Sequence, residues 1–523
     1  MNRSRRLLAL PLAALLALAV AMPVAAAPKG TLERYARDTW RSFVHMVDPN
    51  TGLPTDNING RLHPGSRAAY TSPTNIGMYF WATLAARDLG FIGADEAVDR
   101  ISQTLITLEG MERHEPSGQF WNWYSPQTGE KLTIWPENGD RVFPFASSVD
   151  NGWLASGLLM VSNAVPELSA RAGALAASMD FGCYYDPNAV PNGAGLIRGG
   201  FWLPDDAPGG GAMGDYCAMG EEVLYTGHHY GAFNTEPRIA SYIGIAMGDI
   251  PPEHYFGPWR TFPDNCDWAW QEQQPVGAWR TYTVDDVDYD VFEGVYHYND
   301  KLVVPTWGGS MFEALMVPLV VPEEEWGPTS WGVTHPLYVE SQIEYGLNEA
   351  GYEYWGFSPA SDPEGGYREY GVDVLGMDTT PGLGYTSDHH ELTVIDYGWV
   401  DTDPAEPDCS RPPTTITDYG EGEVTPHAAF LALDFDREAT LANLGNLAAD
   451  FPGLYGRGGF KDAVNVATGK IADRYLSLDQ GMVLAAIANE LTGNQLQGYL
   501  AVTLLPALQP LMAMEQFGAG RVE

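Results

Sequence analysis

The sequence predicts a mainly α-helical fold, an (α/α)6 barrel with long loops and a small β element near 281–298. Two observations predict this fold. Six segments share one pattern, which is a polar or glycine-rich cap, often a proline, and then a helix of small and apolar residues. Charged, amphipathic helices lie between them. A helix that is apolar all round belongs in an interior and one with a polar face belongs outside, so the alternation describes inner helices surrounded by outer ones.

The elements follow one another in a regular order. The inner helices are predicted at residues 71–86, 147–161, 234–248, 308–320, 424–435 and 476–490. The clearest outer helices are predicted at 32–47, 95–114, 336–352 and 436–450. The alternating stretch TYTVDDVDYDVFEGVYHY predicts a hairpin or small sheet. Between the third and fourth inner helices the expected outer helix is replaced by the short, Trp-rich stretch 264–274, so the pattern is weakest there.

The N-terminus predicts export. Arg3, Arg5 and Arg6 precede an apolar run that ends in small residues, as in a secretory signal peptide with cleavage after Ala26. We therefore divide the chain into a signal peptide at 1–26 and a single catalytic domain at 27–523. No later stretch has the ~20 uninterrupted apolar residues of a membrane span. We expect a secreted or periplasmic monomer with no membrane span.

Composition limits the partners. The formal net charge is −40, and removal of the signal makes it three units more negative. Such a surface repels phosphates, so we expect no nucleic-acid partner. The acidity suits a neutral or cationic substrate or a salty medium, or it reflects a general compositional bias. Four cysteines are compatible with two disulfides in an oxidising compartment, with three connectivities open: Cys183, Cys217, Cys266 and Cys409.

Three carboxylates stand just inside predicted inner helices. If these helices are parallel, Asp150, Glu236 and Glu313 meet at one end of the barrel. Each acid has a purely structural alternative. Ser147 with Asp150, and Ser310 with Glu313, have the spacing of a capping box, in which the acid folds back onto its own helix. Glu236 could simply favour the positive end of a helix dipole.

Taken together, the three acids favour glycosidic chemistry. Glycosidic cleavage needs a protonated carboxyl near the leaving oxygen and a second carboxylate as base or nucleophile. A helix dipole alone would lower the pKa of Glu236, so a general acid there needs burial or a neighbouring anion to raise it. Asp150 or Glu313 could supply that anion. Candidate sugar contacts are the polar and aromatic residues expected nearby, namely Tyr70, Thr71, Asn75, Trp121, Trp123, Trp307 and Trp355.

Metal and cofactor sites are not predicted. The histidine pairs at 227–231 and 387–392 lie in short loops, where adjacent histidines seldom reach one metal. The stretch 48–60 has the Asp, Asn and Gly residues of a calcium loop but lacks the sixth-position Gly and late Glu of an EF-hand. We expect no cofactor.

Several motifs, in order from about residue 32 to 490, resemble the glucoamylase-like family, which includes bacterial β-1,2-glucanases and is similar to the (α/α)6 domain of cyclic β-1,2-glucan synthases. The resemblance implies that barrel and activity on β-1,2-linked glucose chains. The motifs are AAYTSPTNIGMYFWATLAARDLGFI, HEPSGQFWNWYSPQTGE, SSVDNGWLASGLL, TEPRIASYIGIAMGDIPPEHYF, WGGSMFEALM and VTPHAAFLAL.

The resemblance also assigns roles. Glu236 stands where the family pattern places its acid, and Glu313 matches the acid of the G-S/T-M-F-E pattern. Asp150 matches a position that is Glu in β-1,2-glucanases and Asp in synthase-like members. The chain departs from the pattern at Pro237, where relatives tend to have Ala, in the insertion before Glu236, and at 376–398.

The sequence thus predicts a secreted glycoside hydrolase that acts on a β-linked glucan, with β-1,2-glucan as the favoured substrate. Glu236 is the expected general acid, and Asp150 and Glu313 compete for the role of base or nucleophile. Two alternatives remain open, a transglycosylase acting on the same glucans and a glycan-binding envelope protein without catalysis.

Overall fold

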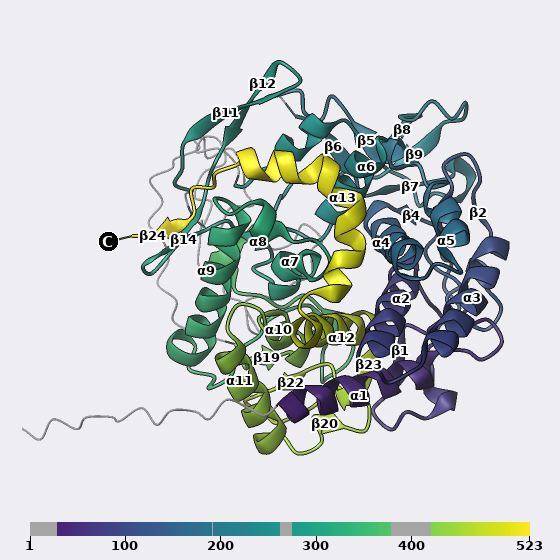
Figure 1. Ribbon diagram of the computed structural model, residues 1–523, viewed down its shortest axis with the longest axis vertical. Helices are drawn as coiled ribbons and strands as arrows, with labels where there is room; N and C mark the ends of the chain where they lie inside the picture. The colour runs from purple at the N-terminus through teal and green to yellow at the C-terminus, as the bar shows by residue number, and fades with distance from the viewer. Residues whose placement is uncertain (1–28, 191, 262–272, 274, 378–419, 523) are drawn as a thin grey trace, which may run out of the picture.

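A ring of six helices forms the centre of the fold. The computed structural model describes residues 29–190, 192–261, 273, 275–377 and 420–522, and helices dominate this part of the chain. In ring order the six are α2 (Pro73–Asp88), α4 (Ser148–Ala164), α6 (Arg238–Met247), α7 (Met311–Leu315), α10 (Pro426–Leu431) and α12 (Ser477–Thr492). Each of α2, α4, α10 and α12 packs against both of its ring neighbours, and α12 returns to α2 (Figure 1). Hydrogen bonds join the starts of α6 and α7.

All six helices begin at the same end of the ring, which we call the mouth. Thr74 in the first turn of α2 bonds Asp150 in the first turn of α4. Glu236, just before α6, likewise bonds Glu313 of α7. On the far side, His427 of α10 and Asp479 of α12 approach to 3.7 Å. Contacts between first turns require the helices to run parallel, so their capping residues surround one opening.

Small residues allow this close packing. A side chain at Gly77 of α2 would place its Cβ 2.4 Å from the carbonyl oxygen of Trp153 in α4. At Gly152 the added Cβ would lie 3.1 Å from Ala240 of α6. Glycine inside a helix costs about 0.5–1 kcal/mol relative to alanine. Here it lets neighbouring backbones touch.

A second layer of helices covers the ring. The ring-facing helices of this layer are α1 (Lys29–Met46), α3 (Ala94–Gly110), α5 (Ser169–Ala176), α9 (Trp331–Glu344), α11 (Arg437–Asp450) and α13 (Gln495–Met514), with the short α8 (Glu323–Trp326) beside α9. Four of these match the outer helices predicted at 32–47, 95–114, 336–352 and 436–450. The stretch 264–272 lies outside the described residues. The C-terminal helix α13 packs on α4, α6 and α8, and so covers the side of the ring where the pattern was weakest (yellow in Figure 1).

Among the described residues, one helix, α13, has the length and the apolar composition that a membrane span requires. Five leucines of this helix are buried in the fold, namely Leu496, Leu500, Leu504, Leu508 and Leu511. Its apolar character is therefore used for packing against the inner ring.

Short β-strands lie in the loops at the mouth and around the rim of the helix ring. The predicted β element is present as the antiparallel hairpin β11 (Trp279–Val284) and β12 (Val287–Phe292), followed by β13 (Tyr296–Tyr298), which pairs with β14 (Lys301–Val303) and β24 (Gly520–Arg521). Directly before α12, β23 (Arg474–Leu476) pairs with β1 (Asn57–Asn59). The remaining small sheets are β2–β3 (113–114, 119–120), β5–β6–β10 (185–186, 196–198, 229–230), β4–β7–β9–β8 (146–147, 200–202, 223–225, 212–214), β15–β18 (306–307, 376–377), β16–β17 (360–361, 367–368), β19–β22 (423–424, 464–465) and β20–β21 (455–456, 459–460).

A disulfide ties one of the loops near the mouth. Cys183 and Cys217 are bonded, with a Cα–Cα distance of 4.4 Å. Cys266 and Cys409 lie outside the described residues. One of the two expected bridges is therefore present, and the partners of the other two cysteines stay a prediction.

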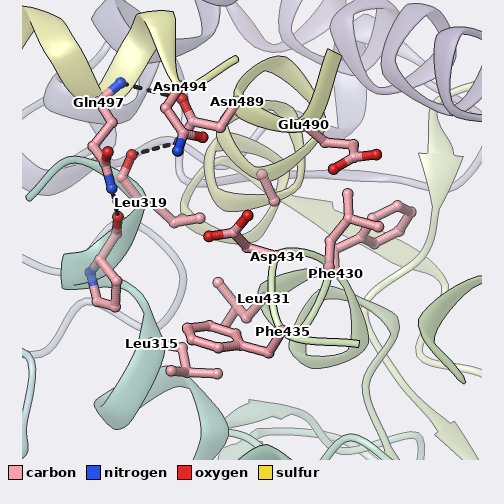
Figure 2. A pocket seen from close by; sticks show the side chains of 13 residues that line it. Leu315, Leu319, Phe430, Leu431, Asp434, Phe435, Asn489, Glu490, Asn494 and Gln497 are labelled. Atoms are coloured by element: carbon pink, nitrogen blue, oxygen red, sulfur yellow. Dashed lines mark hydrogen bonds between the residues drawn. The ribbon is translucent and has the colours of Figure 1, made fainter. Parts of the chain in front are cut away.

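The opposite end of the ring is filled. A cavity of about 30 Å³ lies there among apolar side chains of α7, α10 and α12, which is room for one or two water molecules. Figure 2 shows Asp434 reaching into this cavity between Leu319 and Leu431, and a hydrogen bond from the backbone of Gln497 to Asn489 at its edge. The cavity is too small for a sugar. The mouth, where the three predicted acids lie, is therefore the candidate substrate site.

Candidate active site

Two of the three predicted acids are direct neighbours. The backbone N–H of Glu236 donates to Oε2 of Glu313 over 2.8 Å. The other side of Glu236 is held by Trp153, whose indole N–H donates to its Oε2 over 2.7 Å. Both carboxyl groups remain partly exposed at the mouth. Glu236 is therefore fixed in position and still open to a ligand.

Asp150 lies on the neighbouring wall. Thr74 Oγ1 donates to its Oδ1 over 2.6 Å, and Asn122 Nδ2 donates to its Oδ2 over 2.8 Å. Ser147 caps the helix by accepting from the backbone of Asp150. The carboxylate of Asp150 does not complete a capping box, because its own bonds go to α2 and to the loop at Asn122. The side chain thus links the start of α4 to the start of α2 and to that loop.

Burial and mutual repulsion change the acidity of the neighbouring pair. The pKa of Glu236 is raised well above its usual value, first by burial and then by the charge of Glu313, while the bond from Trp153 works in the opposite direction. Asp150 raises it further. Burial raises the pKa of Glu313 to about 7, against the opposing effects of the Glu236 N–H and of Arg238. The pair therefore retains a proton near neutral pH.

A buried ion pair supports the floor of the site. Arg238, in the first turn of α6, donates to both carboxylate oxygens of Glu323 over 2.8 and 2.9 Å. The same guanidinium donates to the backbone carbonyls of Glu313 and Ala314. Arg238 thereby holds the start of α7 against α6, and it fixes the spacing between Glu236 and Glu313.

A second acidic cluster lies across the mouth. The ligand-type atoms of His427, Asp462 and Asp479 lie within 4.8 Å of one another, and all three residues are buried. His427 Nδ1, Asp462 Oδ1 and Asp479 Oδ2 have no hydrogen-bond partner among the described residues. Burial and the nearby Asp462 raise the pKa of Asp479 well above its usual range. Of the described residues, these three come nearest to a metal-ligand set, since the cysteines near Asp180 are oxidised to a disulfide.

The predicted sugar contacts fall into two groups. Tyr70, Trp123 and Trp307 are partly exposed. Trp121 and Trp355 are each 1% exposed, so neither offers a ring face to a sugar in this structure. They belong to the core because Trp121 packs on His114 and Phe201, and the backbone of Trp355 is bonded to Asn443 of α11.

Thr71 and Asn75 are also buried, at the start of α2. The backbone of Thr71 pairs with Tyr124, which anchors the loop carrying Trp123. The amide of Asn75 donates to Asp56 over 3.0 Å. Both residues therefore stabilise the loops beside the mouth through these hydrogen bonds.

Sequence reasoning missed several residues of this site. Asp479 occupies the third position of an inner helix, the same position as Asp150 and Glu313, so the rule that singled out those acids would also have found it. Trp153 is one turn inside α4, and Arg238 is the first residue of α6. Asp462 lies in a loop far from any predicted helix start, and no sequence signal pointed to it.

Comparisons with known proteins agree with the geometry. Residues 276–497 match a family model named Glycoamylase and described as "Putative glucoamylase". Residues 34–184 match a family described as protein of unknown function (DUF3131). The curated cyclic beta-(1,2)-glucan synthase NdvB of Rhizobium meliloti is 23% identical over 591 aligned residues, which cover 89% of this chain and 18% of that protein. The chain thus spans less than a fifth of that relative.

Solved structures share the fold. An endo-β-1,2-glucanase from Chitinophaga pinensis, in complex with sophorotriose and glucose, has a TM-score of 0.58 at 16% identity, covering 93% of this chain and 97% of that one. An endo-β-1,2-glucanase from Talaromyces funiculosus, in complex with sophorose, has a TM-score of 0.59 at 11% identity, covering 92% and 89%. These matches confirm the resemblance to glucoamylase-like proteins and β-1,2-glucanases that the motifs predicted.

Proposed function

We propose that this chain is a secreted glycoside hydrolase that cleaves β-1,2-linked glucan, with Glu236 as its general acid. The observation that carries the proposal is the position of Glu236. It is a partly exposed carboxyl at the mouth of the helix ring, held by Trp153, with its pKa raised by burial and by Glu313. We interpret the ring and its outer helices as an (α/α)6 barrel, and the endo-β-1,2-glucanases of similar fold support the choice of substrate.

The chemistry follows from these protonation states. A protonated Glu236 gives its proton to the glycosidic oxygen as the bond to the anomeric carbon breaks. Glu313 serves to keep that proton in place, because a second negative charge beside Glu236 disfavours ionisation.

The second carboxylate of the reaction is Asp150 in this proposal. Thr74 and Asn122 each donate to one of its carboxylate oxygens, and an ionised carboxylate can accept further hydrogen bonds. Asp150 stands in the first turn of α4, the ring neighbour of α6, whose start carries Glu236. It either takes the proton of the attacking water or attacks the anomeric carbon itself, and the two routes give opposite stereochemistry.

Product analysis tests the function. The purified protein is incubated with β-1,2-, β-1,3- and β-1,4-linked glucans, and new reducing ends are counted. We expect release from β-1,2-glucan and its near-complete loss in Glu236→Gln. Glu325→Gln, the same change at an exposed site on α8, is the matched control.

Other products would contradict the proposal. Glucans rearranged without new reducing ends would identify a transglycosylase, for which the similarity to a glucan synthase is the supporting observation. Tight glucan binding without any turnover would identify a glycan-binding protein. Export is part of the proposal, and N-terminal sequencing of protein recovered outside the cytoplasm should begin at Ala27.

A further inference from the structure

A polar cleft of about 350 Å³ opens at the rim of the mouth, a volume near the lower limit for small-ligand sites. We call it the outer cleft. The side chains that carry the argument below are Asn57, Asn59, Arg67, Glu137, Asp473 and Arg474. None of them belongs to the three acids of the candidate active site or to the cluster around Asp479.

The floor of the outer cleft is a two-stranded ribbon. Strands β1 and β23 pair with Asn59 opposite Arg474, and side chains alternate along each strand. Ile58 and Tyr475 are buried beneath the ribbon, whereas Asn57, Asn59 and Arg474 face outward. The ribbon therefore presents a row of planar amide and guanidinium groups to the cleft.

Aromatic rings stand beside this polar floor. Tyr70 and Trp135 have ring centroids 4.4 Å apart, and Trp123 packs edge-on against both. The chain segments that carry two of these rings, at Ala69 and at Pro136 and Glu137, line the cleft. Trp135 is partly exposed, as are Tyr70 and Trp123. Planar polar groups next to exposed aromatic rings suit a sugar ring, because the polar groups can bond its hydroxyl groups and the aromatic rings can pack on its apolar C–H face.

The charges that line the cleft cancel, which favours a neutral ligand. Arg67 and Arg474 stand against Glu137 and Asp473 in the lining, and Lys461, outside it, pairs with Asp473 over 2.5 Å and leaves one positive charge in excess nearby. Arg474 is exposed, and within the described residues its guanidinium donates no hydrogen bond. Its donors are therefore available to hydroxyl groups.

The outer cleft lies opposite the candidate acid. It is at the junction of α12 and α2, and Glu236 with Glu313 is at the junction of α6 and α7. In a ring of six these junctions face each other. Neighbouring helix axes about 8–10 Å apart place opposite junctions of such a ring roughly 14–17 Å apart. A ligand that touches both places must contain several sugar units.

We propose that the outer cleft is a distal subsite that binds a glucose unit of a long glucan chain and gives the enzyme its preference for long chains. The proposal rests on the proposed function, because it takes a glucan as the ligand. Arg474 lines the cleft and supplies hydrogen-bond donors, and the partly exposed Trp135, next in the chain to the lining residue Pro136, supplies a ring face at its edge. Neither residue is one of the three acids of the candidate active site.

The test measures binding instead of turnover. In protein carrying Glu236→Gln, to prevent cleavage, titration calorimetry gives the affinities for long β-1,2-glucan and for a β-1,2-linked trisaccharide. We expect Trp135→Ala to lower the long-to-short affinity ratio about tenfold, the loss typical of one aromatic anchor. Arg474→Ala should lower it as well, and it leaves the three rings intact if Trp135→Ala fails to fold. Trp279→Ala, the same change at a tryptophan 61% exposed on β11, is the matched control and should leave the ratio unchanged.

The outcomes separate the two proposals. A ratio unchanged in both Trp135→Ala and Arg474→Ala overturns the distal subsite, even if the protein without Glu236→Gln cleaves glucan. A protein that cleaves nothing but shows the expected ratios refutes the activity and supports the subsite. Absence of any β-1,2-glucan binding refutes both.

Discussion

The backbone N–H of Glu236 donates to the carboxylate of Glu313 over 2.8 Å, and the two acids thereby sit side by side at the mouth of the helix ring. This contact joins the starts of α6 and α7, between which the described part of the chain has no α-helix. Glu313 thus both positions the backbone of Glu236 and raises the pKa of its carboxyl group.

Removing the charge of Glu313 should make Glu236 a stronger acid. Glu313→Gln takes away one of the two main causes of the raised pKa of Glu236. A general acid is active while protonated, so activity falls as pH rises through its pKa. We expect the alkaline limb of the kcat/KM profile to move to lower pH. An unmoved limb would separate Glu313 from the acidity of Glu236.

Removing the indole donor should act in the opposite direction. In Trp153→Phe the hydrogen bond that lowers the pKa of Glu236 is lost, so the pKa rises and the alkaline limb moves to higher pH. Loss of a positioned hydrogen bond should also reduce kcat. The profile measured beside that of Glu313→Gln gives the comparison, and shifts of the same sign in both variants would contradict the electrostatic account.

Asp150→Asn should abolish most turnover. A missing general base costs about 10²–10⁴-fold in rate. Steady-state kinetics on β-1,2-glucan measures the loss, and Thr74→Val, which removes one of its donors, should cost less. Activity close to that of the unaltered protein in Asp150→Asn would transfer the role to Asp479 on the opposite wall.

Breaking the buried ion pair should destabilise the fold. Arg238→Met leaves Glu323 buried without its partner, a change that costs about 3–5 kcal/mol. Urea unfolding at neutral pH measures it. Arg521→Met, which removes a surface ion pair with Asp300, should leave the unfolding midpoint nearly unchanged. Equal effects of the two changes would rule out a special role for the buried pair.

Stability should fall as pH rises from about 6.5 to 8. Burial raises the pKa of Glu313, Glu324 and Glu423 to about 7 and that of Glu293 to about 8. In that range the folded state binds more protons than the unfolded state, so unfolding becomes easier with rising pH. The buried histidines with lowered pKa values oppose this trend near pH 6.5, where they are half charged in the unfolded state, and they become neutral in both states toward pH 7.5. Calorimetric Tm values at high salt, where surface repulsion is screened, should keep this trend, and a Tm that rises with pH would contradict it.

The helical architecture was readable from the sequence because its signals are local. A capping serine or a proline starts every inner helix except α12, as Ser72 and Pro73 do for α2, and the predicted starts fall within a few residues of those observed. Helix α13 was missed because it lies C-terminal to the segments that carry the pattern. It nevertheless packs against α6, where the order along the chain would have placed a different segment.

The site was readable only in part. Asp150, Glu236 and Glu313 converge because the helices that carry them are parallel, and that followed from the pattern. Which tryptophan faces the mouth did not follow, since Trp121 and Trp123 are two residues apart and only Trp123 is partly exposed. Long-range pairing was also hidden, as it brings the loop residue Asp462 to the start of α12.

The shared direction of the six inner helices has a further consequence for how the mouth tolerates its acids. Each helix start carries a partial positive charge of up to about half an elementary charge. This charge belongs to the peptide backbone, so it neither titrates nor depends on lysine or arginine side chains. The carboxylates at the mouth are thus surrounded at every pH by the partial positive charges of the six helix starts. A chain with few basic residues can therefore keep an acidic reaction centre without surrounding it with cations that would bind the carboxylates and block the sugar.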